Sequence, residues 1–61
     1  MAFHNTLNRL MGDRGMKSVQ LAAALTERGA PVEEQTVDRW VQGINEPRGS
    51  EMYAAIAAVF N

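Results

Sequence analysis

Apolar residues recur at helical spacing through the chain, in four segments that glycine and proline separate. The separating residues are Gly12, Gly15, Gly29, Pro31, Gly43, Pro47 and Gly49. Within each segment the apolar side chains fall mostly three or four residues apart, which places them on one face of a helix. The pattern therefore predicts an all-α protein of four or five helices.

The first two segments predict two short helices. The first begins at its expected N-cap, Asn5, and ends at Gly15, which suits a left-handed C-terminal position. The second starts at Lys17 or Ser18, with Ser18 the better cap, and can continue to Gly29. The expected buried side chains are Phe3, Leu7, Leu10 and Met11 in the first helix and Val19, Leu21, Ala22 and Leu25 in the second.

The third segment, from about Glu33 to Gly43, has the clearest amphipathic pattern. Its apolar side is Val37, Trp40, Val41 and Ile44, at positions i, i+3, i+4 and i+7. The fourth segment begins at Ser50, its expected N-cap, and carries a wide apolar stripe of Met52, Tyr53, Ile56, Ala57, Val59 and Phe60. Such a stripe predicts more apolar surface than the core of one small chain hides.

Length and composition narrow the class of protein. The 61 residues allow one domain, residues 1–61, which must use nearly all its apolar side chains in its own core. The absence of cysteine excludes disulfides and thiolate metal sites. No apolar run approaches the roughly 20 residues of a membrane span, and no segment has the pattern of a signal peptide. We therefore expect a cytoplasmic protein with no membrane partner.

Catalytic residues are not indicated. His4 is the only imidazole, and no local pattern supplies the positioned partner that a general base needs, so we interpret it as a solvated terminal residue. Glu33 and Glu34 are adjacent on a helix and point in different directions, so they complement the helix dipole and do not share a site. We expect no enzyme activity, no metal or other cofactor and no small-molecule substrate.

The second and third segments together have the outline of a helix-turn-helix, with an Ala-rich helix, a turn containing glycine and an amphipathic helix. The polar side of the third segment is Glu34, Gln35, Thr36, Asp38, Arg39 and Gln42. Gln, Thr and Arg are side chains that read base edges in the major groove of DNA. An ordinary solvated face is the alternative interpretation.

Three stretches carry a more specific pattern. They are residues 16–22 with the pair Leu21-Ala22, residues 35–43 with Val37, Trp40 and Gly43, and residues 45–48 with Pro47. In order and spacing these stretches, within about residues 6–60, resemble the helix-turn-helix of phage Cro and repressor proteins and of the wider xenobiotic-response-element (XRE) family. The element Thr-Val-x-Arg-Trp-x-x-Gly followed by Pro is the more specific part of the match.

The resemblance implies a compact lambda repressor-like fold with a central helix-turn-helix that binds DNA. It implies base contacts by Glu34, Gln35, Thr36 and Arg39, and phosphate contacts by Lys17, Ser18, Asn45 and Arg48. In this pattern Gln35 pairs with adenine, Arg39 pairs with guanine and Glu34 accepts from a cytosine amino group. Thr36 is equally compatible with an ordinary helix residue.

The chain departs from the family pattern in two places. Six residues, 26–31, separate Leu25 from Val32 where the family has a short turn, so the angle between the two helices stays open. The buried Arg–Glu pair of many members corresponds here to Met11 and Val41, and we expect a hydrophobic contact in its place. Replacing such a pair by apolar residues is often neutral or stabilising.

The charge favours a dimer. DNA-binding domains are usually basic, whereas this chain has a formal net charge of −1 and a pI near 5.6. Only Lys17, Arg39 and Arg48 are expected at the DNA, so one subunit binds weakly and a homodimer is needed. The wide fourth stripe suggests Met52, Val59 and Phe60 as the dimer interface. The alternative is that Phe60 closes the core of one chain.

The sequence thus predicts a Cro-like phage or prophage transcriptional repressor that binds a double-stranded DNA operator. The alternative is a protein-binding module on the same fold, such as an antitoxin or anti-regulator. The net negative charge of the chain is compatible with this alternative.

Overall fold

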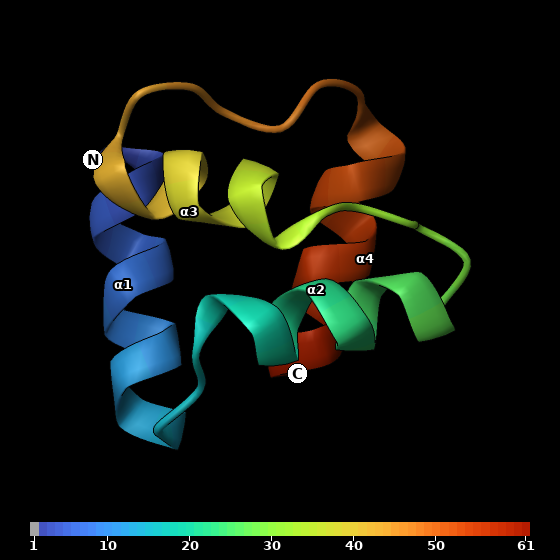
Figure 1. The fold of residues 1–61 in the computed structure, drawn as a ribbon, viewed down its shortest axis with the longest axis horizontal. Helices are drawn as coiled ribbons and strands as arrows, with labels where there is room; N and C mark the ends of the chain where they lie inside the picture. Colours follow the sequence, from blue (N-terminus) through green and yellow to red (C-terminus); the bar gives the residue numbers. More distant parts are fainter. Residues whose placement is uncertain (1) are drawn as a thin grey trace.

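The chain folds into four helices joined by short loops (Figure 1). The computed structural model describes residues 2–61. The helices are α1 (Phe3–Arg14), α2 (Ser18–Glu27), α3 (Glu34–Gln42) and α4 (Ser50–Phe60). No strand is present in this part of the chain, so the predicted all-α class is confirmed, with four helices.

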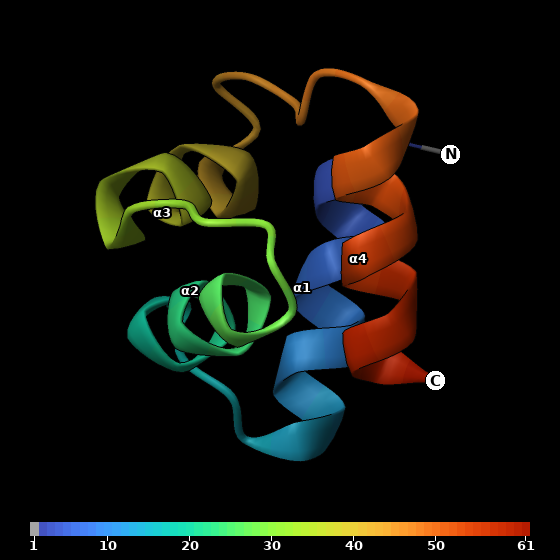
Figure 2. The same cartoon turned by 90° about the vertical axis from the view of Figure 1, so that its right-hand side faces the viewer.

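The helices form two layers. α1 and α4 stand upright on the two sides of Figure 1, and α2 and α3 cross the space between them in a layer of their own, which Figure 2 shows from the side. α3 packs mainly on α1 and α2, and α2 also packs on α4. The connection over residues 28–33 lets the chain turn from α2 into α3, and the two helices form the most extensive contact between any two elements.

The core lies where the two layers meet and is entirely apolar. Its buried side chains are Leu7, Met11, Leu21, Ala22, Leu25, Val37, Trp40, Ile56 and Phe60. No polar or charged residue is buried among residues 2–61, and Phe3, Leu10, Val32 and Val41 pack against its edge. Every helix contributes at least two buried side chains, so the core holds all four together.

The helix ends differ in part from those predicted. Gly15 and Gly43 have positive φ, as expected of residues that end a helix. The prediction of Asn5 as the first N-cap was wrong, because α1 begins at Phe3, whose ring packs edge-on against Tyr53 at 5.4 Å and holds the first turn in place. Ser18 and Ser50 are likewise the first helical residues and not the caps, which are Lys17 and Gly49.

Two predicted core residues are exposed. Val19 is 52% exposed because it lies on nearly the opposite side of α2 from Leu21. Ile44 is 66% exposed because the left-handed Gly43 ends α3 before it, so the helical spacing that relates it to Val37 no longer applies.

Arg14 ties the C-terminal ends of α1 and α4 together. One guanidinium nitrogen donates a hydrogen bond of 2.7 Å to the backbone carbonyl of Phe60, and the guanidinium lies 5.2 Å from the centre of the Phe60 ring. A cation at the end of a helix also complements its dipole. None of the helices described reaches the length and apolar character of a membrane span.

Candidate nucleic-acid interface

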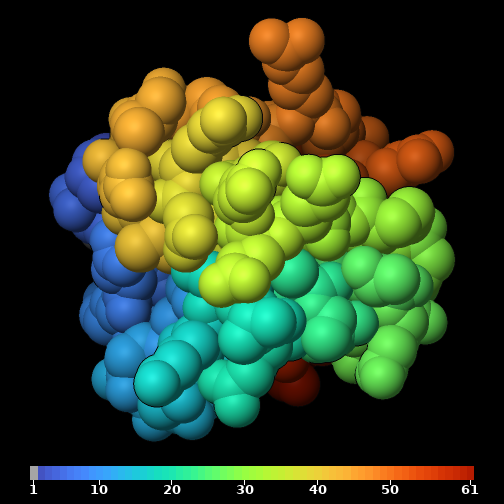
Figure 3. All heavy atoms as spheres, in the orientation of Figure 1, coloured from blue at the N-terminus to red at the C-terminus, as the bar shows by residue number. Residues whose placement is uncertain are grey.

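α3 presents one face to the core and the other to solvent. Val37 is fully buried and Trp40 is 3% exposed, whereas Gln35 and Arg39 are exposed. Glu34 and Gln42 are exposed as well, and Thr36 and Asp38 are half-buried. The first turn of α3 is the part of the molecule farthest from α1 and α4 in Figure 2, and Figure 3 shows α3, in yellow-green, on the face turned to the viewer. The polar side of α3 is therefore not covered by the rest of the chain.

The C-terminal end of α3 is fixed by α1. The side-chain amide of Asn8 donates a hydrogen bond of 2.9 Å to the carbonyl of Val41, one of the last carbonyls of the helix. The ring of His4 packs on Gly43, so closely that a Cβ at this glycine would lie 3.1 Å from it. The interpretation of His4 as a solvated terminal residue was wrong, because it lies in the first turn of α1 and is half-buried in this contact. These contacts orient α3 relative to α1.

Four of the predicted contact residues surround one hollow. Thr36 and Arg39, predicted at the bases, share a hollow of about 260 Å³ with Asn45 and Arg48, predicted at the phosphates. Trp40, Glu46 and the buried Pro47 complete its lining. The fold thus brings the polar side of α3 and the α3–α4 loop to one surface. Glu34 and Gln35 do not line this hollow and project from the first turn of α3.

Lys17 and Ser18 lie at a different place, where α2 begins. They line a hollow of about 360 Å³ that also contains Asn8, Met11 and Val41. Met11 belongs to the apolar core and Val41 packs against it, as expected of residues that replace a buried charge pair.

The charges around α3 are mixed. Exposed carboxylates belong to Glu33, Glu34 and Glu46, and Asp38 is half-buried. The cations on the same elements and at the start of α2 are Lys17, Arg28, Arg39 and Arg48, all exposed. The charge expected at the DNA was counted from Lys17, Arg39 and Arg48 alone and left out these four carboxylates. The carboxylates weaken the long-range attraction of this surface for a polyanion.

Glu46 forms a hydrogen bond with Tyr53, a contact that the sequence did not predict. The Tyr53 hydroxyl donates a hydrogen bond of 3.4 Å to Glu46 Oε1. Partial desolvation and the neighbouring Glu46 carboxylate raise the pKa of Tyr53 above its ordinary value. The contact joins the α3–α4 loop to α4.

The residues predicted to join two subunits are largely used within one chain. Phe60 is 8% exposed and belongs to the core, which favours the alternative that it closes the core of a single chain. Met52 and Val59 are half-buried and pack against the same core. Part of the apolar surface of Met52 and of Val59 is therefore used within one chain.

The part of the chain described contains no group of three or more His, Asp or Glu residues placed to hold a metal ion. Comparisons with protein-family models, with curated proteins and with solved structures gave no significant match.

Proposed function

We propose that the chain binds double-stranded DNA through the solvent-facing side of α3. The observation that carries this proposal is the division of α3 into a buried side, with Val37 and Trp40, and an uncovered polar side, with Gln35 and Arg39. A recognition helix needs both, because it must be anchored in its own domain while its other side enters the major groove.

In this proposal the first turns of α3 read the bases. The Gln35 side-chain amide donates one hydrogen bond to adenine and accepts another from it. Arg39 donates two hydrogen bonds to guanine, and the Glu34 carboxylate accepts one from the cytosine amino group. Thr36 and Arg39 share a hollow with Asn45 and Arg48, so contacts to bases and to the flanking phosphates can form together. Lys17 and Ser18 meet a second stretch of backbone at the start of α2, where free N–H groups favour phosphate.

Two copies of the chain are part of the proposal. Three cations on each subunit neutralise about six phosphates per dimer, which gives a slope of log affinity against log salt near −5. Two α3 helices roughly 34 Å apart then meet successive major grooves of a palindromic site. We propose a cytoplasmic repressor of Cro type that acts by covering promoter DNA, with no cofactor.

A partner protein is the alternative ligand for the same surface. The observation that favours it is that four carboxylates lie on and beside α3 and offset the cations there. Carboxylates on this surface repel DNA phosphates, whereas they can pair with a basic partner protein.

Selection of bound sequences from random double-stranded DNA, followed by fluorescence anisotropy at two salt concentrations, tests the proposal. We expect one enriched palindromic motif and tighter binding at the lower salt concentration. No enrichment and no binding at low salt, by a protein whose circular dichroism shows it folded, would overturn DNA binding and favour the partner protein.

A further inference from the structure

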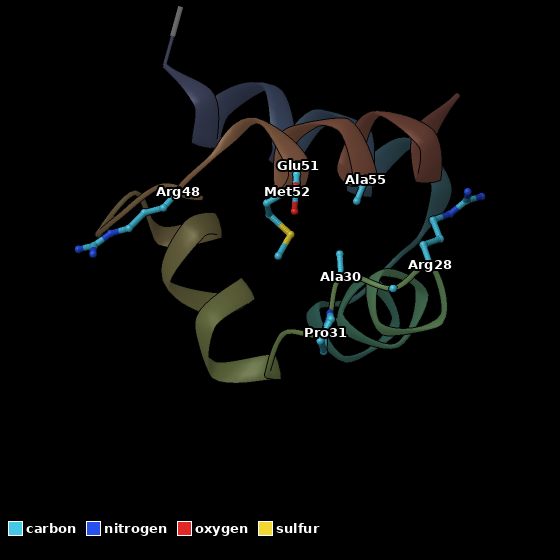
Figure 4. Close-up of a pocket in the computed structure, with 8 residues that line it drawn as sticks. Arg28, Ala30, Pro31, Arg48, Glu51, Met52 and Ala55 are labelled. Atoms are coloured by element: carbon cyan, nitrogen blue, oxygen red, sulfur yellow. The ribbon is translucent and has the colours of Figure 1, made fainter.

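A third hollow, outside the candidate interface, lies between the α2–α3 connection and α4 (Figure 4). Its volume is about 440 Å³, which is in the range of sites that hold a ligand or a short stretch of peptide. Ala30 and Pro31 line it from the connection, and Met52 and Ala55 line it from α4. These four side chains give the hollow an apolar part, beside which the Glu51 side chain also lines it.

The two ends of this hollow are cationic. Figure 4 shows Arg48 and Arg28 on opposite sides of it, each pointing outward to solvent. Neither guanidinium has a hydrogen bond or ion pair with any of residues 2–61. Glu51 supplies the only carboxylate of the lining, and Figure 4 shows it between the two arginines. An occupant that fits these charges carries an anion at each end and none in the middle.

We propose that this hollow docks an acidic segment of a partner protein in an extended conformation. An apolar side chain of the segment covers Met52 and Ala55, and a carboxylate on each side of it pairs with Arg28 and Arg48. A purely apolar occupant leaves both guanidiniums unpaired, and a compact anion reaches only one of them. Residues 28–31, which line the hollow, belong to the stretch 26–31 that separates Leu25 from Val32 where the resembling family has a short turn. The proposal thus gives this longer connection a role.

Docking of this segment opposes DNA binding. Arg48 lines both this hollow and the hollow beside Thr36 and Arg39, so a carboxylate paired with Arg48 displaces a phosphate. The wall that contains Ala30 and Pro31 also leads directly into α3. This second part of the inference rests on the proposed DNA-binding function, whereas the docking itself does not.

Capped peptides test the docking. The probes have a Glu at each end and one, two or three Leu between, and the matched controls have Gln in place of both Glu. In an amide NMR titration of the full chain we expect one acidic length to bind best and to shift Gly29, Met52 and Ala55. Arg28→Gln should weaken binding about two- to fivefold, the range of an exposed ion pair, and Glu51→Gln should strengthen it. Arg9→Gln, on α1 and away from the hollow, should change nothing.

Competition with DNA tests the second part. Saturating the hollow with the best acidic peptide should lower the affinity for the selected DNA, and the decrease should be smaller in Arg28→Gln, whose own DNA affinity should equal that of the wild type. Equal binding of the Gln peptides, or shifts scattered over the surface, would overturn the docking. Unchanged DNA affinity with the peptide bound would overturn the competition with DNA. If the free protein binds no DNA, the proposed function fails and the titration alone decides the docking.

Discussion

The two faces of α3 differ in what constrains them. The inner face, with Val37 and Trp40, is buried against α1 and α2, and its apolar character was predictable from helical spacing alone. The outer face, with Gln35 and Arg39, contacts nothing that requires its particular side chains. Burial therefore explains the inner residues through stability, whereas the exposed outer residues are the ones we propose for a ligand. The predictions below test whether the two roles separate in this way.

The largest expected effect is on the inner face. Trp40→Ala should lower the free energy of unfolding by about 3–5 kcal/mol, because it removes the largest core side chain and leaves a cavity. A single core of this size rarely supplies more than about 3–5 kcal/mol in total, so the variant should be largely unfolded at 25 °C by circular dichroism. Gln42→Ala, two residues further along α3 and exposed, is the control and should melt like the wild type. A folded Trp40→Ala variant would contradict the assigned role of the inner face.

Gly43→Ala should cause the next largest loss of stability. Its φ of 78° costs a residue with a Cβ about 1–2 kcal/mol, and the new methyl group also meets the His4 ring at 3.1 Å. Gly15→Ala has a similar φ of 60° with open space around it, so it isolates the backbone cost. Urea denaturation should show a greater loss of stability for Gly43→Ala than for Gly15→Ala. Equal losses would mean that His4 does not restrict the end of α3.

Asn8→Ala should cost less, about 0.5–1.5 kcal/mol, because it removes one hydrogen bond to the Val41 carbonyl. The site is exposed, so water replaces part of the bond and the lower half of this range is expected. Arg9→Ala, the neighbouring exposed position, serves as the control. A thermal melt of Asn8→Ala that coincides with that of Arg9→Ala would show that the end of α3 does not depend on this bond.

The sequence predicted the helices better than their ends. Helical spacing placed all nine buried residues in the predicted apolar stripes. The first N-cap was misplaced because the contact of Phe3 with Tyr53, 50 residues away along the chain, extends α1 beyond what local capping preferences indicate. Such contacts depend on tertiary structure and leave no local signal.

The candidate site was predictable in its parts but not in its grouping. The spacing of Gln35 and Arg39 relative to Val37 and Trp40 was enough to expect them on the outer side of α3. Thr36 and Arg39 share a hollow with residues of the α3–α4 loop because of the path that this loop takes, which spacing does not predict. The hollow between Arg28 and Arg48 depends in the same way on the path of a connection that has no periodic pattern.

The most direct test of the central claim measures stability and DNA affinity together in Arg39→Ala. We expect the free energy of unfolding to stay within about 0.5 kcal/mol of the wild type, as for an exposed side chain. The affinity for the selected DNA should fall by about 5- to 150-fold, which corresponds to the 1–3 kcal/mol of one bidentate base contact. Unchanged affinity, or a loss of affinity explained by unfolding, would contradict the claim that the outer face of α3 is kept for a ligand.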